Sequence, residues 1–447
     1  MTRWLTPRRL SYAWLAGGAL WLAWLVSVLL GPGNLDLAGQ PVGTDFLEFY
    51  AAGATLLRGE SARLYDMDYQ ARLQREIIGP GLEAYYAFIT PPFFALLFVP
   101  LALLPYGLAF ALWSFLGLVA LWASVRLMGI RSSRPFLWAL TWFPVFAAVS
   151  YGQNSLLSLF LLALTFRLWR DGRPWAAGLA LAGLMYKPQL TLGLALLWLV
   201  SGRDGWKALG GWALGTVALT ALCAVAWPEA SQAYLHFART ILPDLPNWQD
   251  FPLWHLHTVR GFWRLLLPES PLLGDVLTLL LTGLGLVEGY RFWRCHRLHP
   301  PLTFAAAVAL TLWITPHAMI YDWAILLIPA VLLWEEVPER RREWRALYAL
   351  VWLTTFLAPP LTYGQWRLAH RAVQITLLAL SLALYRIRQS LNRPPILAIS
   401  AKMGYDMIDK LHRGTRPDHQ PDDRHEPVPP GNGSEPEQPG CPGIPSG

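Results

Sequence analysis

The chain has 447 residues, of which 54% are hydrophobic and 15% charged, and its formal net charge at pH 7 is +7. A soluble protein of this length carries far more charge, and apolar runs of about 18 residues recur along the chain, so we predict a polytopic α-helical membrane protein. The basic residues cluster in short gaps between apolar runs, as in cytoplasmic loops, and no nucleic-acid-binding motif accompanies them. Cys223, Cys295 and Cys441 lie far apart and predict neither a metal site nor a disulfide framework.

The first predicted element is an apolar helix over residues 12–30, preceded by Arg3, Arg8 and Arg9. A basic N-terminus followed by an apolar run resembles a signal sequence. No pair of small residues that could mark a cleavage site follows closely, and the run is long. We therefore predict an uncleaved first transmembrane helix with its N-terminus in the cytoplasm.

Residues 31–90 form a long polar stretch, which we predict to be the first external loop. Asp45 and Glu48 lie near its start, three residues apart among aromatic side chains. If Thr44 or Asp45 caps a helix, both carboxylates lie near the first helical turn and on roughly one face. Asp45 is therefore either a helix cap or a catalytic acid. The same loop contains two patterns typical of short helices on the membrane surface, over residues 46–58 and 68–78.

The membrane part continues with apolar segments separated by short polar gaps, and we expect about twelve spans in all. Residues 95–104 are too short for the ~30 Å hydrocarbon core, which leaves open whether they cross or re-enter. A second external loop is predicted over residues 228–271. The segments after the first are 106–127, 136–149, 155–169, 175–186, 189–200, 209–227, 272–290, 302–314, 323–334, 346–361 and 369–385.

The distribution of basic residues predicts which gaps are cytoplasmic. It places both termini in the cytoplasm and puts the polar interruptions near residues 152–154, 187–188 and 316–317 on the extracytoplasmic side, with Asp45. We therefore predict an integral membrane domain over residues 1–392. Residues 393–447 are rich in Pro, Gly, Asp and Glu, and predict a cytoplasmic, mostly disordered tail.

Two polar interruptions lie in the middle third of the chain. Gln153 and Asn154 follow Gly152 between apolar segments; they form either a polar turn at the interface or a group that binds sugar hydroxyls. Lys187 precedes Pro188, which breaks a helix and frees backbone carbonyls. Its ammonium group either reaches water or binds the phosphate of an anionic lipid.

Two further groups contain histidine. His255, His257 and Arg260 share one loop; the histidine spacing is compatible with a metal, but no third ligand lies nearby, so phosphate contact by Arg260 and His255 is the better prediction. His257 is predicted to pack at the interface. His317, followed by Asp322, lies at a proline break, where it could bind a phosphate leaving group or form an Asp–His pair that tunes a proton.

The order of these motifs resembles glycosyltransferase family 87 over roughly residues 12–388. The resemblance is carried by Gly43-Thr44-Asp45-Phe46, Leu64-Tyr65-Asp66, Thr90-Pro91-Pro92-Phe93 with Pro100-Leu101-Ala102-Leu103-Leu104-Pro105, Gly152-Gln153-Asn154-Ser155, Ala177-Gly178 with Lys187-Pro188-Gln189, and Pro316-His317-Ala318 with Tyr321-Asp322. The tail is not covered.

The resemblance implies a GT-C fold. It also implies an inverting transfer of a hexose, typically mannose, from a polyprenyl-phosphate sugar to a lipid-linked or polymer acceptor on the extracytoplasmic face. The family's acid in the first external loop corresponds to Asp45, and Glu48 could share its role. No cofactor or metal is implied.

Inverting transfer requires a carboxylate to take the proton of the acceptor hydroxyl, and cations or hydrogen-bond donors to stabilise the departing phosphate. A lipid-linked-sugar flippase or other transporter is the alternative function, and a ligase that uses a lipid-pyrophosphate donor ranks third. The predicted site comprises Asp45 and Glu48 as catalytic residues, Lys187, Arg260, His317 and His255 as ligands of the donor phosphate, and Gln153, Asn154 and Asp322 as ligands of the sugar or acceptor.

Overall fold

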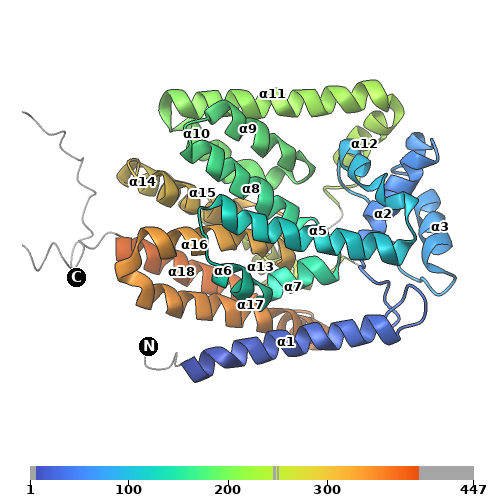
Figure 1. Ribbon diagram of the computed structural model, residues 1–447, viewed down its shortest axis with the longest axis horizontal. Coiled ribbons are helices and arrows are strands. Elements are labelled where there is room, and N and C mark those ends of the chain that lie inside the picture. Colours follow the sequence, from blue (N-terminus) through green and yellow to red (C-terminus); the bar gives the residue numbers. More distant parts are fainter. Residues whose placement is uncertain (1–6, 245–247, 249–250, 392–447) are drawn as a thin grey trace, which may run out of the picture. The chain divides into compact units, whose positions relative to one another are not determined.

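The computed structural model describes residues 7–244, 248 and 251–391, and these residues are helical with no β-strand (Figure 1). The predicted all-α class is therefore confirmed. The predicted tail over residues 393–447 lies outside the described part. The chain divides into two units, Met1–Ala383 and Leu384–Gly447, and the features discussed below belong to the first.

Eighteen α-helices occur within the described residues. They are α1 (Pro7–Leu30), α2 (Phe46–Leu57), α3 (Met67–Ile78), α4 (Pro92–Ala95), α5 (Tyr106–Leu127), α6 (Arg134–Leu140), α7 (Phe143–Ser150), α8 (Ser155–Arg170), α9 (Pro174–Ala182), α10 (Leu192–Leu199), α11 (Gly202–Ala226), α12 (Pro228–Thr240), α13 (Val259–Leu266), α14 (Pro271–Cys295), α15 (Pro300–Ile314), α16 (Leu327–Glu336), α17 (Arg341–Ala369) and α18 (Ile375–Leu391). Many begin with proline in the first turn, because that position needs no N–H donor and the ring fixes a helical φ.

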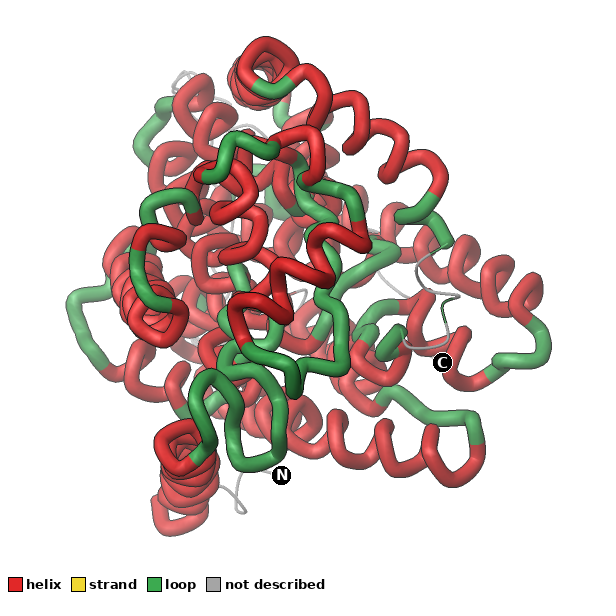
Figure 2. Tube along the Cα trace, turned by 90° about the vertical axis from the view of Figure 1, so that its right-hand side faces the viewer, coloured by secondary structure: helices red, strands yellow, loops and turns green. Residues whose placement is uncertain are grey.

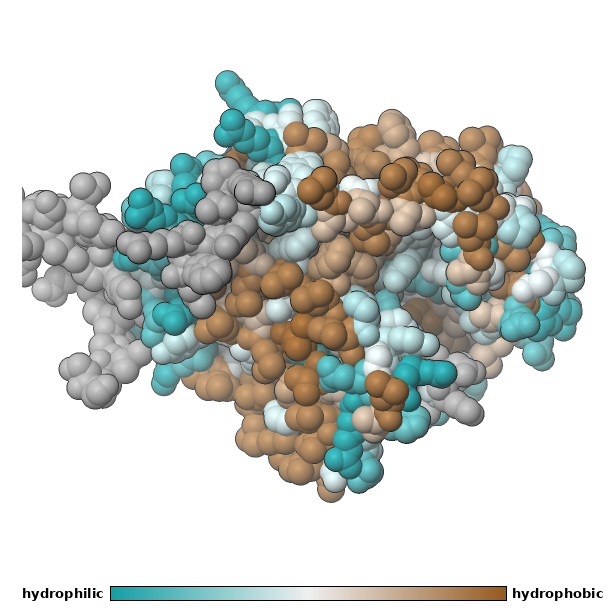
Figure 3. Space-filling view, turned by 90° about the horizontal axis from the view of Figure 1, so that it is seen from below, coloured by the Kyte–Doolittle hydropathy of each residue, from teal (hydrophilic) through white to brown (hydrophobic). Residues whose placement is uncertain are grey.

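Five helices in the described part of the chain are long and apolar enough to cross a membrane: α1, α5, α11, α14 and the segment Pro338–Ala369 that contains α17. The count is six if α7 and α8 form one broken span. In Figure 3, apolar side chains form a belt between two more polar ends. Such a belt matches the hydrocarbon layer of a bilayer, and the protein is a membrane protein. The predicted total of about twelve spans stays a prediction.

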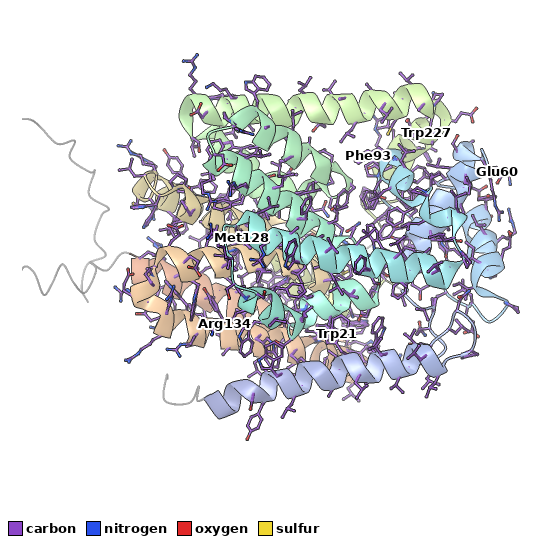
Figure 4. All side chains as sticks on the ribbon, in the orientation of Figure 1. Trp21, Glu60, Phe93, Met128, Arg134 and Trp227 are labelled. Atoms are coloured by element: carbon purple, nitrogen blue, oxygen red, sulfur yellow. The ribbon has the colours of Figure 1, made fainter. Side chains whose placement is uncertain are left out.

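α1 lies along one side of this bundle and packs through tryptophan. The side chain of Trp21 points from α1 toward its neighbours (Figure 4), and its indole Nε1 donates a hydrogen bond of 2.8 Å to the Leu140 carbonyl. The Trp21 ring also meets Phe146 edge to face, with centroids 5.1 Å apart. The contacts tie the first helix to α6 and α7, so tryptophan acts here in helix packing rather than only as an anchor at the membrane boundary.

The structure corrects two sequence-based expectations. α2 does not lie on a surface: nine of its twelve residues are buried, because it is apolar on every side and packs against α3, α4 and the turns that follow α4. α17 continues through Pro359 and Pro360 to Ala369, beyond the predicted end at residue 361. Proline is tolerated within membrane helices when neighbouring groups satisfy the freed carbonyls.

The residues between α3 and α5 also differ from one apolar segment. They form α4, followed by short 3₁₀ turns at Leu96–Phe98 and Leu101–Leu103. No single helix crosses here. The aromatic rings of this stretch pack inward: Phe98 stacks on Phe49 at 5.0 Å, and Phe94 stacks on Tyr186 at 4.2 Å. The stretch therefore connects the buried α2 to the 3₁₀ turn Gly183–Tyr186 that follows α9.

α9 and α11 pack closely through glycine. A Cβ atom added at Gly178 would lie 1.9 Å from the carbonyl oxygen of Ala208. We expect Gly178→Ala to lower the free energy of unfolding by about 1–3 kcal/mol, because backbone must move to admit the methyl group. Gly283→Ala on α14 is the matched control, since nothing lies within 4 Å of its added Cβ. Thermal unfolding in detergent measures both; equal melting temperatures for Gly178→Ala and wild type would contradict the packing argument.

Three apolar helices are interrupted, and the interruptions carry the polar residues. α7 and α8 meet at a bend of 120°. α9 passes through the 3₁₀ turns Gly183–Tyr186 and Pro188–Thr191 before α10 begins, with Lys187 between the turns. α15 ends at Ile314, and the 3₁₀ helix Ile320–Leu326 leads into α16. The breaks expected from the sequence at Gln153, Lys187 and His317 are therefore present in the described chain.

Candidate active site

The loop that carries Asp45 is attached to the break between α7 and α8. The carbonyl oxygen of Tyr151 accepts hydrogen bonds from the backbone N–H groups of Asp45 and Phe46, at 2.9 and 3.0 Å. Gly43 and Gly152 have φ of +69° and +68°, and a Cβ at Gly152 would lie 2.4 Å from that of Phe46. Glycine is therefore required for the two loops to approach this closely.

The Tyr151 carbonyl thus satisfies the first N–H donor of α2 from a distant part of the sequence. Asp45 occupies the residue before α2, but its side chain makes no capping hydrogen bond. The interpretation of Asp45 as an ordinary side-chain cap is therefore wrong. Its carboxylate accepts no hydrogen bond from the first turn of α2, and the Leu47 N–H, which a cap could bind, donates to the Gly43 carbonyl at 3.3 Å instead. The Asp45 carboxylate is left available for other contacts.

Four predicted site residues form one continuous series of polar contacts. Gln153 Nε2 donates to Asp45 Oδ2 at 2.8 Å, and Lys187 Nζ lies 3.4 Å from Gln153 Oε1. Lys187 Nζ also donates to Asp322 Oδ1 at 2.7 Å. The residues come from the first loop and from each of the three helix breaks. Figure 2 looks onto the end of the protein that carries α2 and α3, where loops shown in green run between the helices.

The ion pair between Lys187 and Asp322 is buried. Their side chains are 12% and 2% exposed. The Asp322 carboxylate also accepts hydrogen bonds from the Ser155 hydroxyl at 2.8 Å and from the Met319 N–H at 3.1 Å. A buried charge requires such partners. The predicted role of Asp322 in binding sugar stays a prediction, although its oxygens already accept three hydrogen bonds within the protein.

Lys187 has a second neighbour, Tyr321, which precedes Asp322 in the break between α15 and α16. Its Nζ lies 5.0 Å from the ring centroid of Tyr321, close enough for attraction between the cation and the ring. Together with Asp322, this ring holds the ammonium group in place. Ser155 and Tyr321 belong to the sequence motifs, but the sequence alone predicts no role for them. Their direct adjacency to Asn154 and Asp322 was the signal that could have identified them.

The two acids of the first loop have altered acidity. Withdrawal from water raises the pKa of Asp45 to about 6, against the opposing effects of the Gln153 hydrogen bond and the positive charge of Lys187. The pKa of Glu48 is raised well above its ordinary value, first by burial and then by the neighbouring negative charge of Asp45. A carboxylate with a pKa near neutrality suits general-base catalysis, and Asp45 has such a pKa.

His317 lies close enough to Lys187, Asp322 and Arg260 for their charges to act on it. The pKa of His317 is lowered to about 4, chiefly by withdrawal from water; the negative charge of Asp322 opposes this, and the positive charges of Lys187 and Arg260 add to it. His317 is thus neutral at pH 7 and can donate one N–H. Its ring lies 6.1 Å from that of Phe251. Arg260 Nε is 3.9 Å from Asp275 Oδ1, a long contact that leaves its guanidinium group able to bind another anion.

The two histidines of the second loop have different surroundings. His257 is fully buried, its Nδ1 is 2.7 Å from the Thr376 hydroxyl and its Nε2 has no partner. His255 packs against Trp254 and Tyr151, with ring centroids 3.9 and 5.9 Å away, and burial lowers its pKa to about 4. His257 has the packed position that the sequence predicts. The role of His255 in binding phosphate stays a prediction.

Asn154 is the remaining predicted residue. It is completely buried, and both atoms of its side-chain amide lack a hydrogen-bond partner. Its backbone carbonyl accepts from Ser158 and Tyr186. An unpaired buried amide costs free energy unless a ligand or water binds it. Among the described residues, no group of three or more His, Cys, Asp or Glu side chains could hold a metal ion.

A helical membrane protein whose acid, amide and lysine converge at broken helices has the character of a membrane enzyme. The chain belongs to glycosyltransferase family 87, which matches residues 88–316. This match includes Gln153 and Lys187 but neither Asp45 nor Asp322. No solved structure matches the chain.

One curated relative is the polyprenol-phosphate-mannose-dependent alpha-(1-2)-phosphatidylinositol pentamannoside mannosyltransferase of Mycolicibacterium smegmatis. It is 32% identical over 215 residues, which are 45% of this chain and 48% of the relative. The similarity thus spans about half the length of that protein.

Proposed function

We propose that this protein transfers a mannosyl residue from polyprenyl-phosphate mannose to a lipid-linked or polymer acceptor on the extracytoplasmic face of the cell membrane, with inversion. The observation that carries the proposal is the contact series from Asp45 through Gln153 to Lys187. These contacts support a shared site for a candidate base and a buried cation. Family membership and the name of the curated relative support the sugar and the donor.

In the proposed reaction, an acceptor hydroxyl attacks C1 of the donor sugar while the bond between C1 and the phosphate oxygen breaks. The hydroxyl proton passes to the Asp45 carboxylate, and the polyprenyl phosphate leaves with the electron pair of the broken bond. Attack from the face opposite the leaving group inverts the anomeric centre. Asp45 then returns its proton to water. Glu48 shares the position and could assist the base.

The phosphate of the donor is a diester with one negative charge, which Lys187 matches. A second negative charge develops on the leaving oxygen as the bond to C1 breaks. Neutral His317 supplies a hydrogen bond to this charge, and Arg260 and His255 complete the proposed phosphate site. Preorganised donors of this kind stabilise a developing charge more strongly in a dry site than in water. Asn154 is the proposed ligand of a sugar hydroxyl, since its buried amide lacks a protein partner.

The proposal includes a multi-pass arrangement with about twelve spans of the GT-C kind and both termini in the cytoplasm. The end of the protein with α2, α3 and α12 would face the exterior, and Glu60, Phe93 and Trp227 lie at this end in Figure 4. The polyprenyl chain would lie in the membrane near residues 95–104. Cysteine labelling at Glu60 and at Arg134 in intact cells tests this orientation: Glu60 should react with an impermeant reagent and Arg134 should not.

The central experiment supplies radiolabelled polyprenyl-phosphate mannose to membranes that contain the protein and to matched membranes that lack it. We expect a new labelled lipid or polymer only when the protein is present. Label that crosses the bilayer without a new product would instead indicate the flippase. Donor that is neither converted into a product nor moved across the membrane would contradict both functions.

The pH dependence of transfer follows from the acidity of Asp45. Its carboxylate must be ionised to accept a proton, and its pKa in the folded protein is about 6. We expect activity to be low at pH 5, to rise through about pH 6 and to level off above pH 7. The donor diester stays singly charged over this range and cannot cause the change. Initial rates between pH 5 and 9 measure the profile, and a flat acidic side would contradict the assignment of the base.

A further inference from the structure

Gln153 lies between the proposed base and the proposed phosphate-binding cation, and its neighbours fix the orientation of its amide. Lys187 and the backbone N–H of Asn154 both donate, and they lie 3.4 and 3.3 Å from Gln153 Oε1. The Asp45 carboxylate accepts, and it lies 2.8 Å from Nε2. A flipped amide would place donor against donor at one end and acceptor against acceptor at the other.

The backbone around Gln153 is also held firmly. Its own N–H donates to the Ala148 carbonyl at 2.8 Å, and the Trp113 indole donates to the Gly152 carbonyl at 2.9 Å. The residue is 8% exposed. Its carbonyl oxygen accepts from two donors and one of its amide hydrogens is bound. Little hydrogen-bonding capacity is left for a sugar, which was its predicted ligand.

We propose that Gln153 is a positioning residue that orients the Asp45 carboxylate and joins it to Lys187, rather than a ligand of the sugar. The inference rests on the proposed function. If so, the base and the group that binds the donor phosphate are connected by hydrogen bonds. Lys187 donates to Asp322 on one side and to the side-chain carbonyl of Gln153 on the other. Lys187 thereby fixes the direction in which the amide presents its N–H to Asp45.

A pH-dependent test must account for each group around Asp45. Glu48 and Asp322 are acidic and Lys187 is basic. The tyrosines do not ionise between pH 5 and 9, since the pKa values of Tyr86 and Tyr151 are raised to about 12 and the pKa of Tyr321 is raised well above its ordinary value. The groups whose charges act on Asp45, or on which Asp45 acts, are Glu48 on α2, Tyr86 between α3 and α4, Tyr106 on α5, Tyr151 at the α7–α8 break, Lys187, and Tyr321 and Asp322 before α16.

The experiment compares pH–rate profiles of wild type and Gln153→Ala with radiolabelled polyprenyl-phosphate mannose. Loss of a hydrogen bond to the ionised carboxylate raises its pKa. We expect the midpoint of the acidic side to move up by about one pH unit, which is a tenfold loss of activity at low pH. Much of the loss should disappear by pH 9. Asn154→Ala is the matched control: it removes a neighbouring amide that has no contact with Asp45, and its midpoint should stay in place.

Two additions make the outcome specific. The two pH–rate profiles are repeated in a Glu48→Gln background, which has no ionisable group at position 48. A midpoint shift that persists there belongs to Asp45, and one that disappears belongs to Glu48. Melting temperatures in detergent show whether Gln153→Ala is folded. A folded variant with the same fractional loss at every pH, or with no loss, would overturn the inference. An inactive wild type would instead overturn the proposed function, so the two failures are distinguishable.

Discussion

Asp45→Asn is expected to reduce transfer by roughly a hundred- to ten-thousand-fold, the range that a general base contributes. Asparagine has the same shape, and its carbonyl oxygen can still accept the hydrogen bond from Gln153 Nε2. The Tyr151 carbonyl continues to bind the backbone N–H groups that begin α2. The variant should therefore fold and insert normally while lacking a proton acceptor. Initial rates at pH 8 measure the loss.

Glu48→Gln is the comparison that assigns the base. Glu48 lies in the first turn of α2, and burial together with the negative charge of Asp45 raises its pKa well above the ordinary value, which disfavours its ionised form. We expect a smaller loss of activity than in Asp45→Asn. Substantial transfer by Asp45→Asn together with inactivity of Glu48→Gln would show that Glu48 is the base and that Asp45 is not. Full activity in both variants would remove the base from this loop altogether.

Lys187→Met is expected to have the largest effect on stability. The substitution preserves much of the side-chain length but leaves Asp322, whose side chain is 2% exposed, without its counter-ion. Breaking a buried ion pair by removing one partner costs about 3–5 kcal/mol. Transfer should be lost as well, because the donor phosphate loses its cation. Melting temperatures and donor-binding assays in detergent measure the two effects separately.

The double variant Lys187→Met with Asp322→Asn separates the stabilising role of the pair from its role with the donor. Asparagine removes the unpaired charge, and its carbonyl oxygen can still accept from Ser155 or from the Met319 N–H. We expect the double variant to regain most of the lost stability and none of the lost donor binding. Recovery of binding would show that Lys187 does not contact the phosphate. Failure to regain stability would show that the Asp322 charge was not the cause.

The sequence predicted the helical class and the positions of the polar breaks, because each break stands out against an apolar run. Gln153, Lys187 and Asp322 were each recognised in this way. Their mutual contacts were not predictable from spacing, since 135 residues separate Lys187 from Asp322 and 108 separate Gln153 from Asp45. Helical periodicity relates residues within one helix and gives no information on which helices become neighbours.

The sequence leaves the role of Asp45 open between a cap and a catalytic acid for the same reason. The first N–H groups of α2 donate to the carbonyls of Tyr151 and Gly43, which are backbone groups whose positions no side-chain pattern reveals. The burial of α2 was missed because a loop rich in polar residues favoured an exposed helix. Residues Phe46–Leu57 are mostly apolar on all faces of the helix, and only Glu48 among them is charged. This pattern indicates an interior position.

The ion pair between Lys187 and Asp322 also bears on biosynthesis. Membrane helices enter the bilayer in order from the ribosome, so Lys187 is synthesised well before its counter-ion. Until α15 and the residues before α16 have joined the bundle, its ammonium group must stay hydrated or pair with a lipid headgroup. A chain that stalls before residue 322 therefore carries an ammonium group at position 187 that lacks its protein counter-ion.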